Sequence, residues 1–589
     1  MKQTKLYSRI AVLSLFAANS FSLRADAPFF PTGLTVASSG ELLITHKGKK
    51  SVDMYAPADF RLVRSVSLSD EPTGVATGKD YYYVTTFGQT GNLQIVSSAT
   101  GRVEATVPTG SGATAPLLSP DGRYVYVCNR FSGTVSEVDV KSRKVNRTVR
   151  VLREPVRALF SADGRYLFVA NFLPDGRADV ETVTARISVV DARSFRVVRN
   201  ISLANGSNAL RGICLTPDGR YLLVVHNLGR FTVPTSQLQQ GWMNTSAFSL
   251  IDVASQSYLG TVVVDEPERG AAGVWDIACD DNHLYVNHSG THEVSVIDYP
   301  ALIRRFEQYE DKTRLDFDLN FLYGIRKRIP LRGNGPRNFV LKDGKLYIPT
   351  YFSDILNVLD TRTLTLECAE LNPSRHETDE NKGERYFNDA SRCFQNWQSC
   401  NGCHPGDGRT DGMNWDLMND GVGNPKNCKS LLFSHVTPPN MISGIRQDAE
   451  HAVRAGFRFI QFFNIAEDEA VCVDAYLKSL RPVPSPYLVD GKLSPLAEEG
   501  KKVFEKEKCD ECHSGPYYTN LKTYRIGTDI EFEKGWDTPT LCEVWRTAPY
   551  LFDGRAKTME EVFEVYKHGV HSKLSKKEIK ALTEYVNSL

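Results

Sequence analysis

The chain has 589 residues, more than the roughly 250–300 at which a single hydrophobic core stops growing, so several domains are expected. Its 41% hydrophobic and 24% charged residues exclude wholesale disorder. Lys plus Arg and Asp plus Glu both total 70, and this zero net charge argues against nucleic acid as a partner.

The N-terminus, residues 1–27, has the pattern of a secretory signal peptide. A basic start precedes the short apolar run Ile10–Ala18, and Ala25-Asp26-Ala27 offers a small-x-small cleavage site. The alternative is an uncleaved membrane anchor. No later stretch approaches the ~18 apolar residues needed to span a bilayer. We therefore expect an exported, periplasmic protein without a transmembrane segment once the signal is removed.

A repeat of about 42 residues follows the signal. Its clearest copies are Ser119–Tyr124, Ser161–Tyr166 and Thr216–Tyr221, in which an Asp-Gly turn precedes an apolar run. The last apolar position of the run in each copy falls at Ile44, Val84, Val127, Val169, Val224, Val286 and Ile348. This period suits one four-stranded propeller blade, with insertions around residues 231–244 and 301–327.

The repeat predicts an all-β, seven-bladed propeller over residues 28–372, whose closure into a ring leaves no long exposed sheet edge. The sequence resembles the YVTN-type β-propeller repeat family over roughly residues 29–371, most closely in the middle three units. Nothing in the sequence indicates what the propeller binds.

The hydrophobic pattern of the sequence changes near Pro373, where helical patterns begin. Cys400-Asn-Gly-Cys-His404 recurs as Cys509-Asp-Glu-Cys-His513, an offset of 109 residues, and matching Gly-x-x-x-Phe segments open the two halves. A proline-rich stretch, residues 481–487, lies between them. We expect two mostly α cytochrome c-type haem domains, residues 373–485 and 486–589.

Each Cys-x-x-Cys-His motif places two thiols about one helical turn apart, followed by an imidazole, which is the requirement for covalent haem attachment. By composition, about 0.005 such motifs are expected per chain by chance. A zinc ribbon needs closer cysteine pairs, and a thioredoxin-like dithiol needs no following histidine. We therefore expect two c-type haems, attached through Cys400 and Cys403 and through Cys509 and Cys512, with His404 and His513 as proximal ligands.

The duplication, together with the segment Trp545–Arg555, resembles the bacterial dihaem cytochrome c peroxidase family, which includes the MauG-like enzymes. The resemblance covers residues 383–589. It implies two haem domains facing each other across a shared structural Ca²⁺, whose ligands fall on Asn427 and the backbone carbonyls of Thr547 and Pro549. Hard oxygen donors of this kind suit Ca²⁺. A simple turn role is the alternative for these residues.

The sequence does not decide which residue is the sixth ligand of either haem iron. At the second haem, the position of the axial ligand in the family is Tyr566, as in the MauG-like branch, with His568 or His571 as alternatives. At the first haem, the candidates are Met413, Met418, His435 and Met441. Core packing is the alternative for each methionine.

Catalytic acid–base candidates near the first haem are Glu450 and His451, for which a solvated helix face is the alternative. The family's catalytic Glu has no clear match, and the Trp expected between the haems is absent. The leading interpretation is a dihaem redox enzyme that reduces peroxide or oxidises a substrate and relays electrons between haems. Its partner is a redox protein or a small-molecule oxidant or substrate. The alternatives are a pure electron-transfer protein that docks partners on its propeller, and a redox sensor whose propeller binds a protein or glycan.

Overall fold

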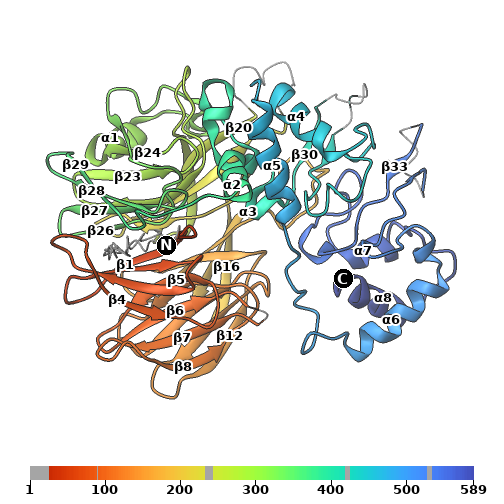
Figure 1. Ribbon diagram of the computed structural model, residues 1–589, viewed down its shortest axis with the longest axis horizontal. Coiled ribbons are helices and arrows are strands. Elements are labelled where there is room, and N and C mark those ends of the chain that lie inside the picture. The colour runs from red at the N-terminus through yellow and green to blue at the C-terminus, as the bar shows by residue number, and fades with distance from the viewer. Residues whose placement is uncertain (1–25, 89, 233–242, 418–422, 424, 527–532) are drawn as a thin grey trace, which may run out of the picture.

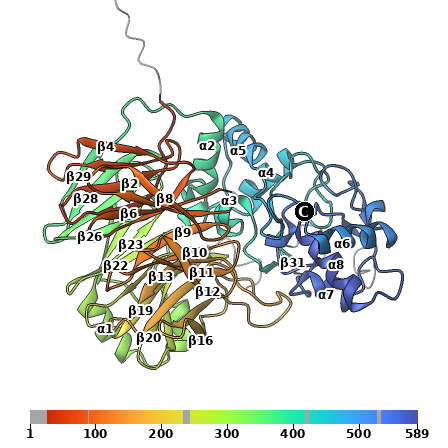
Figure 2. The ribbon, with the colours of Figure 1, turned by 90° about the horizontal axis from the view of Figure 1, so that it is seen from below.

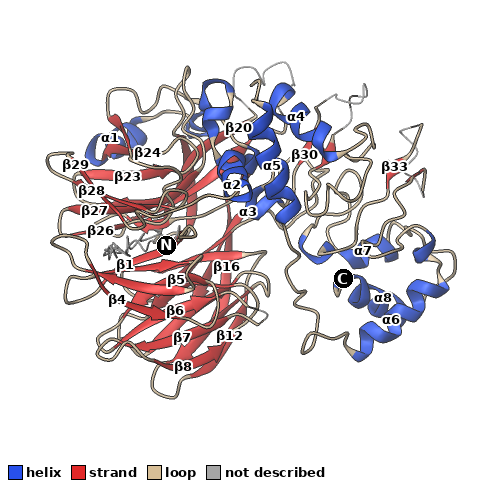
Figure 3. Ribbon diagram, viewed as in Figure 1, coloured by secondary structure: helices blue, strands red, loops and turns tan. Residues whose placement is uncertain are grey.

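The computed structural model describes residues 26–88, 90–232, 243–417, 423, 425–526 and 533–589. The predicted signal peptide therefore lies outside the described residues, apart from its last two positions. Strands form the N-terminal part and helices gather in the C-terminal part (Figure 3). Within the described segments, no helix is both long enough and apolar enough to cross a membrane.

Seven antiparallel sheets are arranged as blades around one axis (Figure 1). The strands of the first four blades are β1 (Pro31–Val36), β2 (Leu42–His46), β3 (Ser51–Tyr55), β4 (Leu62–Ser67); β5 (Pro72–Thr77), β6 (Tyr81–Thr86), β7 (Asn92–Ser97), β8 (Val103–Pro108); β9 (Ala113–Leu118), β10 (Tyr124–Asn129), β11 (Thr134–Asp139), β12 (Lys144–Arg150); and β13 (Pro155–Phe160), β14 (Tyr166–Asn171), β15 (Arg186–Asp191), β16 (Arg196–Ser202). Those of the last three are β17 (Ser207–Asn208), β18 (Ile213–Leu215), β19 (Tyr221–Gly229), β20 (Asn244–Asp252), β21 (Ser257–Val263); β22 (Val274–Cys279), β23 (His283–His288), β24 (Glu293–Asp298), β25 (Arg326–Pro330); and β26 (Val340–Lys342), β27 (Lys345–Thr350), β28 (Ile355–Asp360), β29 (Leu366–Glu370). The predicted seven-bladed propeller is confirmed.

The 42-residue repeat marks the same strand of every blade. The seven aligned apolar positions from Ile44 to Ile348 fall on β2, β6, β10, β14, β19, β23 and β27, and each is fully buried. Three Asp-Gly turns share one geometry: in the first, Ser119 Oγ donates to Asp121 and accepts from the Tyr124 amide, at 2.6 and 3.0 Å. Gly122 supplies the positive φ of 70° that the turn requires.

The predicted insertion around residues 301–327 is a short helix, α1 (Tyr299–Gln308), and a 3-10 turn, η2 (Lys312–Phe317), between β24 and β25. The other insertion falls largely outside the described residues. The ring closes where the chain before β1 meets the last blade, because the Phe29 and Phe30 amides donate to the Asp354 carboxylate at 2.8 and 3.0 Å.

The C-terminal region contains two helical units that lie beside the propeller (Figure 2). The longer helices are α2 (Asp379–Asn388), α4 (Ala449–Phe459) and α5 (Glu467–Ser479), then α6 (Pro495–Lys506), α7 (Met559–Glu564) and α8 (Lys576–Asn587). The shorter elements are η3 (Ala390–Arg392), η4 (Phe394–Asn396), η5 (Cys400–Gly402), α3 (Pro405–Gly408), β30 (Asn414–Trp415), β31 (Lys426–Asn427), η6 (Cys509–Glu511), β32 (Thr523–Tyr524), β33 (Trp536–Asp537) and η7 (Val544–Arg546).

The two units repeat the same packing. In the first, Phe387 of α2 meets Tyr476 of α5 with ring centroids 5.4 Å apart; in the second, Phe504 of α6 meets Tyr585 of α8 at 5.3 Å. The X-Pro peptides that end at Pro439 and Pro549 are both cis. The duplication read from the sequence is therefore a duplication of structure.

Candidate haem sites and the propeller cavity

The first Cys-x-x-Cys-His motif folds as the 3-10 turn η5, which brings both thiols and the imidazole to one side of the chain. His404 Nδ1 donates a hydrogen bond to the Arg409 carbonyl at 3.0 Å. Because this bond occupies Nδ1, Nε2 is left as the nitrogen with a free lone pair. Burial lowers the pKa of His404, so the ring stays neutral as a metal ligand must.

The second motif repeats this arrangement on η6. His513 Nδ1 donates to the Tyr518 carbonyl at 3.1 Å, again five residues further along the chain. Burial also lowers the pKa of His513. Both histidines are therefore held in the tautomer and orientation that a proximal haem ligand needs.

A cavity of about 250 Å³ lies in front of the first motif, with Cys400, Cys403 and His404 in its wall. Helix α4 lines it with Ala449, Ala452, Val453, Gly456 and Phe457, an apolar face at helical spacing. A Cβ added to Gly456 would meet nothing within 4 Å. Two thiols and an imidazole beside an open, apolar space fit a covalently bound haem.

The two catalytic candidates on α4 point away from this cavity. Glu450 pairs with Lys478 at 2.8 Å, and His451 pairs with Asp448 at 2.6 Å, with 63% of its side chain exposed. Among the described residues that line the cavity, His404 is the only histidine, and none is an aspartate or glutamate. A catalytic role for Glu450 and His451 stays a prediction. Their ion pairs are on the solvent side of α4, as expected for a solvated helix face.

One of the four candidate axial ligands at the first site reaches the cavity. Met441 lines the cavity, and its own backbone φ is 73°. Met413 is buried against the propeller, with its sulfur 3.7 Å from Asn208, and His435 pairs with Asp474 at 3.0 Å. Met418 lies outside the described residues.

At the second site, His568 faces His513, with ring centroids 6.5 Å apart. Two imidazoles bound on opposite sides of one metal have centroids about 6.3 Å apart, for metal–nitrogen bonds of about 2.0 Å. Burial, together with the neighbouring His513, lowers the pKa of His568 to about 4, so this ring is neutral as well. The spacing therefore fits a metal held between two histidines.

The other two candidates at the second site are turned elsewhere. The Tyr566 hydroxyl donates to the Arg555 carbonyl at 3.0 Å. His571 is exposed, and its backbone amide donates to Glu507 at 2.7 Å. Of the three residues proposed from the sequence, His568 is the one whose ring lies beside that of His513.

An aromatic pair joins the two haem-motif units. The rings of Phe433 and Tyr517 lie 4.9 Å apart, Phe433 beside the cavity residue Leu432 and Tyr517 beside the Tyr518 carbonyl that holds His513. Sequence reasoning missed this pair because its members are 84 positions apart and belong to different units. The aromatic spacing within either motif gives no signal of it.

Two of the three proposed calcium ligands meet around Gly554. A Cβ added to Gly554 would lie 2.8 Å from Asn427 Nδ2 and 2.9 Å from Pro549 Cγ. The backbone N–H of Asn427 donates to the Phe552 carbonyl at 2.7 Å, and the Thr547 hydroxyl donates to the Val544 carbonyl at 3.1 Å. No cluster of three or more His, Cys, Asp or Glu that suits a metal occurs in the described segments. The calcium site stays a prediction.

The propeller reaches the first motif through buried charges. Glu154 of the propeller accepts from Arg546 at 3.0 Å, Arg546 pairs with Glu543 at 3.2 Å, and Glu543 pairs with Arg409 at 2.9 Å. Arg409 is the residue whose carbonyl holds His404. This chain of ion pairs ties the orientation of the proximal imidazole to the docking of the propeller.

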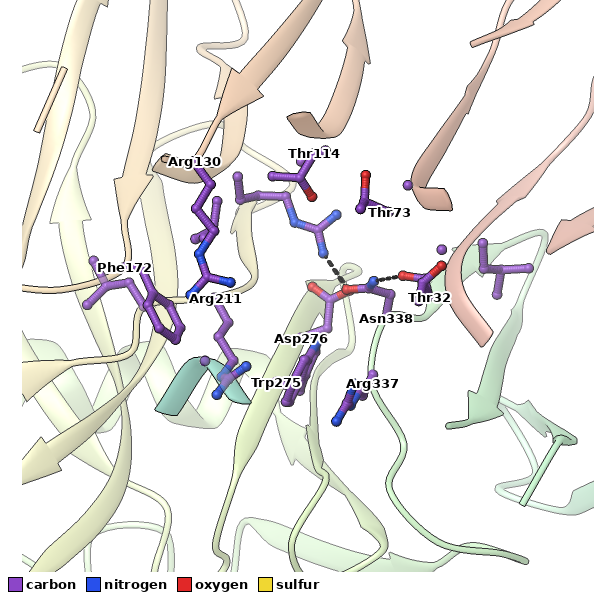
Figure 4. Close-up of a pocket in the computed structure, with 18 of the residues that line it drawn as sticks. Thr32, Thr73, Thr114, Arg130, Phe172, Arg211, Trp275, Asp276, Arg337 and Asn338 are labelled. Atoms are coloured by element: carbon purple, nitrogen blue, oxygen red, sulfur yellow. Dashed lines mark hydrogen bonds and ion pairs between the residues drawn. The ribbon is translucent and has the colours of Figure 1, made fainter. Parts of the chain in front are cut away.

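A second cavity, of about 280 Å³, lies on the propeller axis (Figure 4). Its described lining residues include four arginines, Trp275 and Asp276, and none is a histidine, cysteine, methionine or tyrosine. These residues offer no side chain that commonly ligates haem iron.

Comparisons with known proteins match parts of the chain. Residues 77–204 match the family model described as Cytochrome D1 heme domain, a segment that covers most of blades two to four. Subunit gamma of hydrazine synthase from Kuenenia stuttgartiensis is 26% identical over 272 residues, covering 35% of this chain and 76% of that protein. Subunit beta is 29% identical over 202 residues, covering 32% of this chain and 52% of that protein. The chain is distantly related to hydrazine synthase subunits.

A solved structure of hydrazine synthase from the same organism has the same fold over 58% of this chain and 99% of its own, with a TM-score of 0.53 and 21% identity. The segment that matches the haem-domain model contains no histidine or methionine. The described lining of the axial cavity lacks both residue types as well. The match therefore supports the propeller fold, and the prediction of haem rests on the C-terminal motifs.

Proposed function

We propose that the chain is an exported redox enzyme that binds two c-type haems covalently, one at each Cys-x-x-Cys-His motif. The support is the repeated proximal arrangement, in which His404 and His513 each donate from Nδ1 to a carbonyl five residues on. When bound, the haems supply redox-active iron. The protein itself provides the thiols, the neutral imidazoles and the space in front of them.

The difference between the two sites carries the proposal. His568 stands opposite His513, whereas α4 presents Ala449, Ala452 and Gly456 to the first cavity. An iron site closed by two imidazoles exchanges electrons, and a site with an apolar open face admits a small molecule. We assign substrate chemistry to the first site and electron relay to the second.

The lining of the first cavity bears on the substrate. Peroxide cleavage needs a group that accepts and returns a proton beside the iron, and the described lining residues offer no carboxylate there. The names of the relatives point instead to small nitrogen compounds such as hydrazine. Oxidation or reduction of a small nitrogen compound is therefore our leading reaction class. Peroxide reduction is the second, favoured by the duplicated haem-motif units.

Electron passage between the sites has a structural candidate. The Phe433–Tyr517 pair, with its 4.9 Å separation, takes the place of the bridging tryptophan that this sequence lacks. Calcium on Asn427, Thr547 and Pro549 is part of the proposal, because it would join segments of both units. Electrons would enter or leave through a redox partner protein. Because both relatives are named as subunits, we expect this protein to act within a multi-subunit assembly.

The test uses the full-length protein, matured with haem. We expect two covalent haems per chain, one of them high-spin and open to added ligands and the other low-spin and closed. Stopped-flow mixing with hydrazine and with peroxide then separates the two reaction classes. Absence of covalent haem refutes the proposal outright. Two low-spin haems inert to both compounds would instead establish the pure electron-transfer alternative, with the propeller as a docking platform.

A further inference from the structure

The cavity on the propeller axis is lined by both parts of the protein. The inner strands and loops of the blades supply most of its wall, and Asn401, Gly406 and Asp407 of the first motif segment supply the rest. Asn401 lies between Cys400 and Cys403 in the chain. The cavity therefore sits directly behind the loop that carries the first haem motif.

Four arginines and two carboxylates face this space, so its wall carries an excess of positive charge. Arg130 pairs with Glu154 at 2.7 Å, outside the lining. Arg157 pairs with Asp276 at 3.2 Å and donates to Asn338 at 2.8 Å. These two arginines are already neutralised by neighbouring carboxylates.

The other two arginines, Arg211 and Arg337, have no carboxylate in direct contact; Asp407 acts on both only through space, as Glu384 does on Arg337. Among the described residues, the guanidinium groups of Arg211 and Arg337 make ring contacts but no hydrogen bond or ion pair. Both instead lie against Trp275, at 3.7 and 4.4 Å from the ring centroid. Stacking on the ring orients a guanidinium and leaves its N–H groups free. Figure 4 shows both side chains beside Trp275 at the cavity.

Two of the donors at this place are fully buried as well as unpartnered. Nε of Arg337 and Nη2 of Arg130 are buried without a hydrogen bond. Burial and the neighbouring charge of Arg337 lower the pKa of Arg211 well below its usual value. Buried donors without partners are costly, and two like charges side by side add to that cost. A negatively charged acceptor in the cavity would relieve both.

We propose that the axial cavity binds a small oxyanion, held by Arg211 and Arg337 on either side of Trp275. The planar fork of a guanidinium matches a group with two or three acceptor oxygens, such as nitrate, sulfate or a carboxylate. Asp407 in the wall disfavours large or highly charged anions, because each added negative charge would face it.

The site has a consequence that rests on the proposed function. Because Asn401 and Asp407 belong to the first motif segment, an anion in the cavity lies close to the first haem. Negative charge near iron favours its ferric state. We expect a bound anion to lower the reduction potential of the first haem more than that of the second.

Calorimetric titration of the full-length, haem-matured protein with nitrate and with sulfate tests the site. We expect saturable binding of at least one anion at one site per chain, and no binding of chloride at the same concentration. Arg211→Gln and Arg337→Gln should weaken it roughly ten- to a hundred-fold, the loss expected for one charge-assisted contact. The matched control is Arg332→Gln, because Arg332 is exposed and pairs with Glu370 outside the cavity.

Thermal unfolding keeps the test decisive if a variant is difficult to titrate. The anion should raise the Tm of the wild type and of Arg332→Gln, and not that of Arg211→Gln. Because Arg211 loses only ring contacts, such as its stacking on Trp275, and no hydrogen bond or ion pair, its replacement should leave the anion-free protein folded. Absence of saturable binding to either anion, or equal binding in Arg211→Gln, overturns the site. Binding without any change in the haem potentials leaves the site standing and refutes its coupling to the first haem.

Discussion

Replacing His568 by alanine tests whether the second iron is held between two histidines. The 6.5 Å separation of the His513 and His568 rings is within about 0.2 Å of the value for two imidazoles on one metal. The pKa of His568 is lowered to about 4, so protons do not compete for its nitrogen at neutral pH. If His568 holds the iron of one of the two proposed haems, half of the haem in each chain should change from low-spin to a high-spin form.

The measurement is electron paramagnetic resonance of the ferric protein together with its visible spectrum. Tyr566→Phe is the matched control, because it removes only a hydroxyl that donates to the Arg555 carbonyl. It should cost about 1 kcal/mol of stability and leave both spin states unchanged. If Tyr566→Phe altered the second haem while His568→Ala did not, the ring-to-ring argument would be refuted and tyrosine would be the ligand.

Three further changes test the docking of the propeller, the relay and the helix packing. Although burial opposes ionisation, Arg546 and two other arginines lower the pKa of Glu154 from 4.5 to about 2, so its stabilising effect is full above pH 4.5 and is lost as the pH falls towards 2. Glu154→Gln should remove about 3 kcal/mol of this acid dependence, measured by denaturant unfolding across that range. Phe433→Leu should slow electron passage between the haems in stopped-flow reduction, because it breaks the ring contact with Tyr517. Gly500→Ala should destabilise the second unit by about 1–3 kcal/mol, since its new Cβ would lie 1.9 Å from a carbonyl oxygen of α8.

Each of these changes has a control in the same chain. Glu104→Gln removes an exposed carboxylate and should leave the acid profile as it is. Phe459→Leu alters an aromatic residue that is 54% exposed, and should not change the relay rate. Gly176→Ala adds a Cβ to open space and should be neutral. A wild-type acid profile in Glu154→Gln, an unchanged relay in Phe433→Leu, or full stability in Gly500→Ala would contradict the respective argument.

Local patterns predicted most of the fold. The Asp-Gly turns and the seven buried positions from Ile44 to Ile348 repeat along the chain because every blade is built from consecutive antiparallel strands that pack in the same way. The Cys-x-x-Cys-His motifs could also be recognised from the sequence, since covalent attachment of one haem needs two thiols and an imidazole within five residues. These features depend on short-range spacing, which a sequence records directly.

The groups opposite the motifs could not be predicted in this way. Tyr566 and His568 are two residues apart, and only the end of α7 at Glu564 and the turn after it decide which of them faces His513. Met441 reaches the first cavity and Met413 does not, because the latter packs against the propeller. A ligand set drawn from separate segments depends on how those segments are folded together.

The sequence by itself therefore determined the seven blades, the duplicated C-terminal unit and the two haem-attachment motifs. Only the tertiary structure decided what surrounds them: the apolar face of α4, the Phe433–Tyr517 pair, and the unpartnered Arg211 and Arg337 on either side of Trp275. The physical reason is the separation along the chain between the residues that make each feature. Turns and attachment motifs are made by neighbours in the chain, whereas cavities and buried charges are made by residues that meet only when the chain has folded.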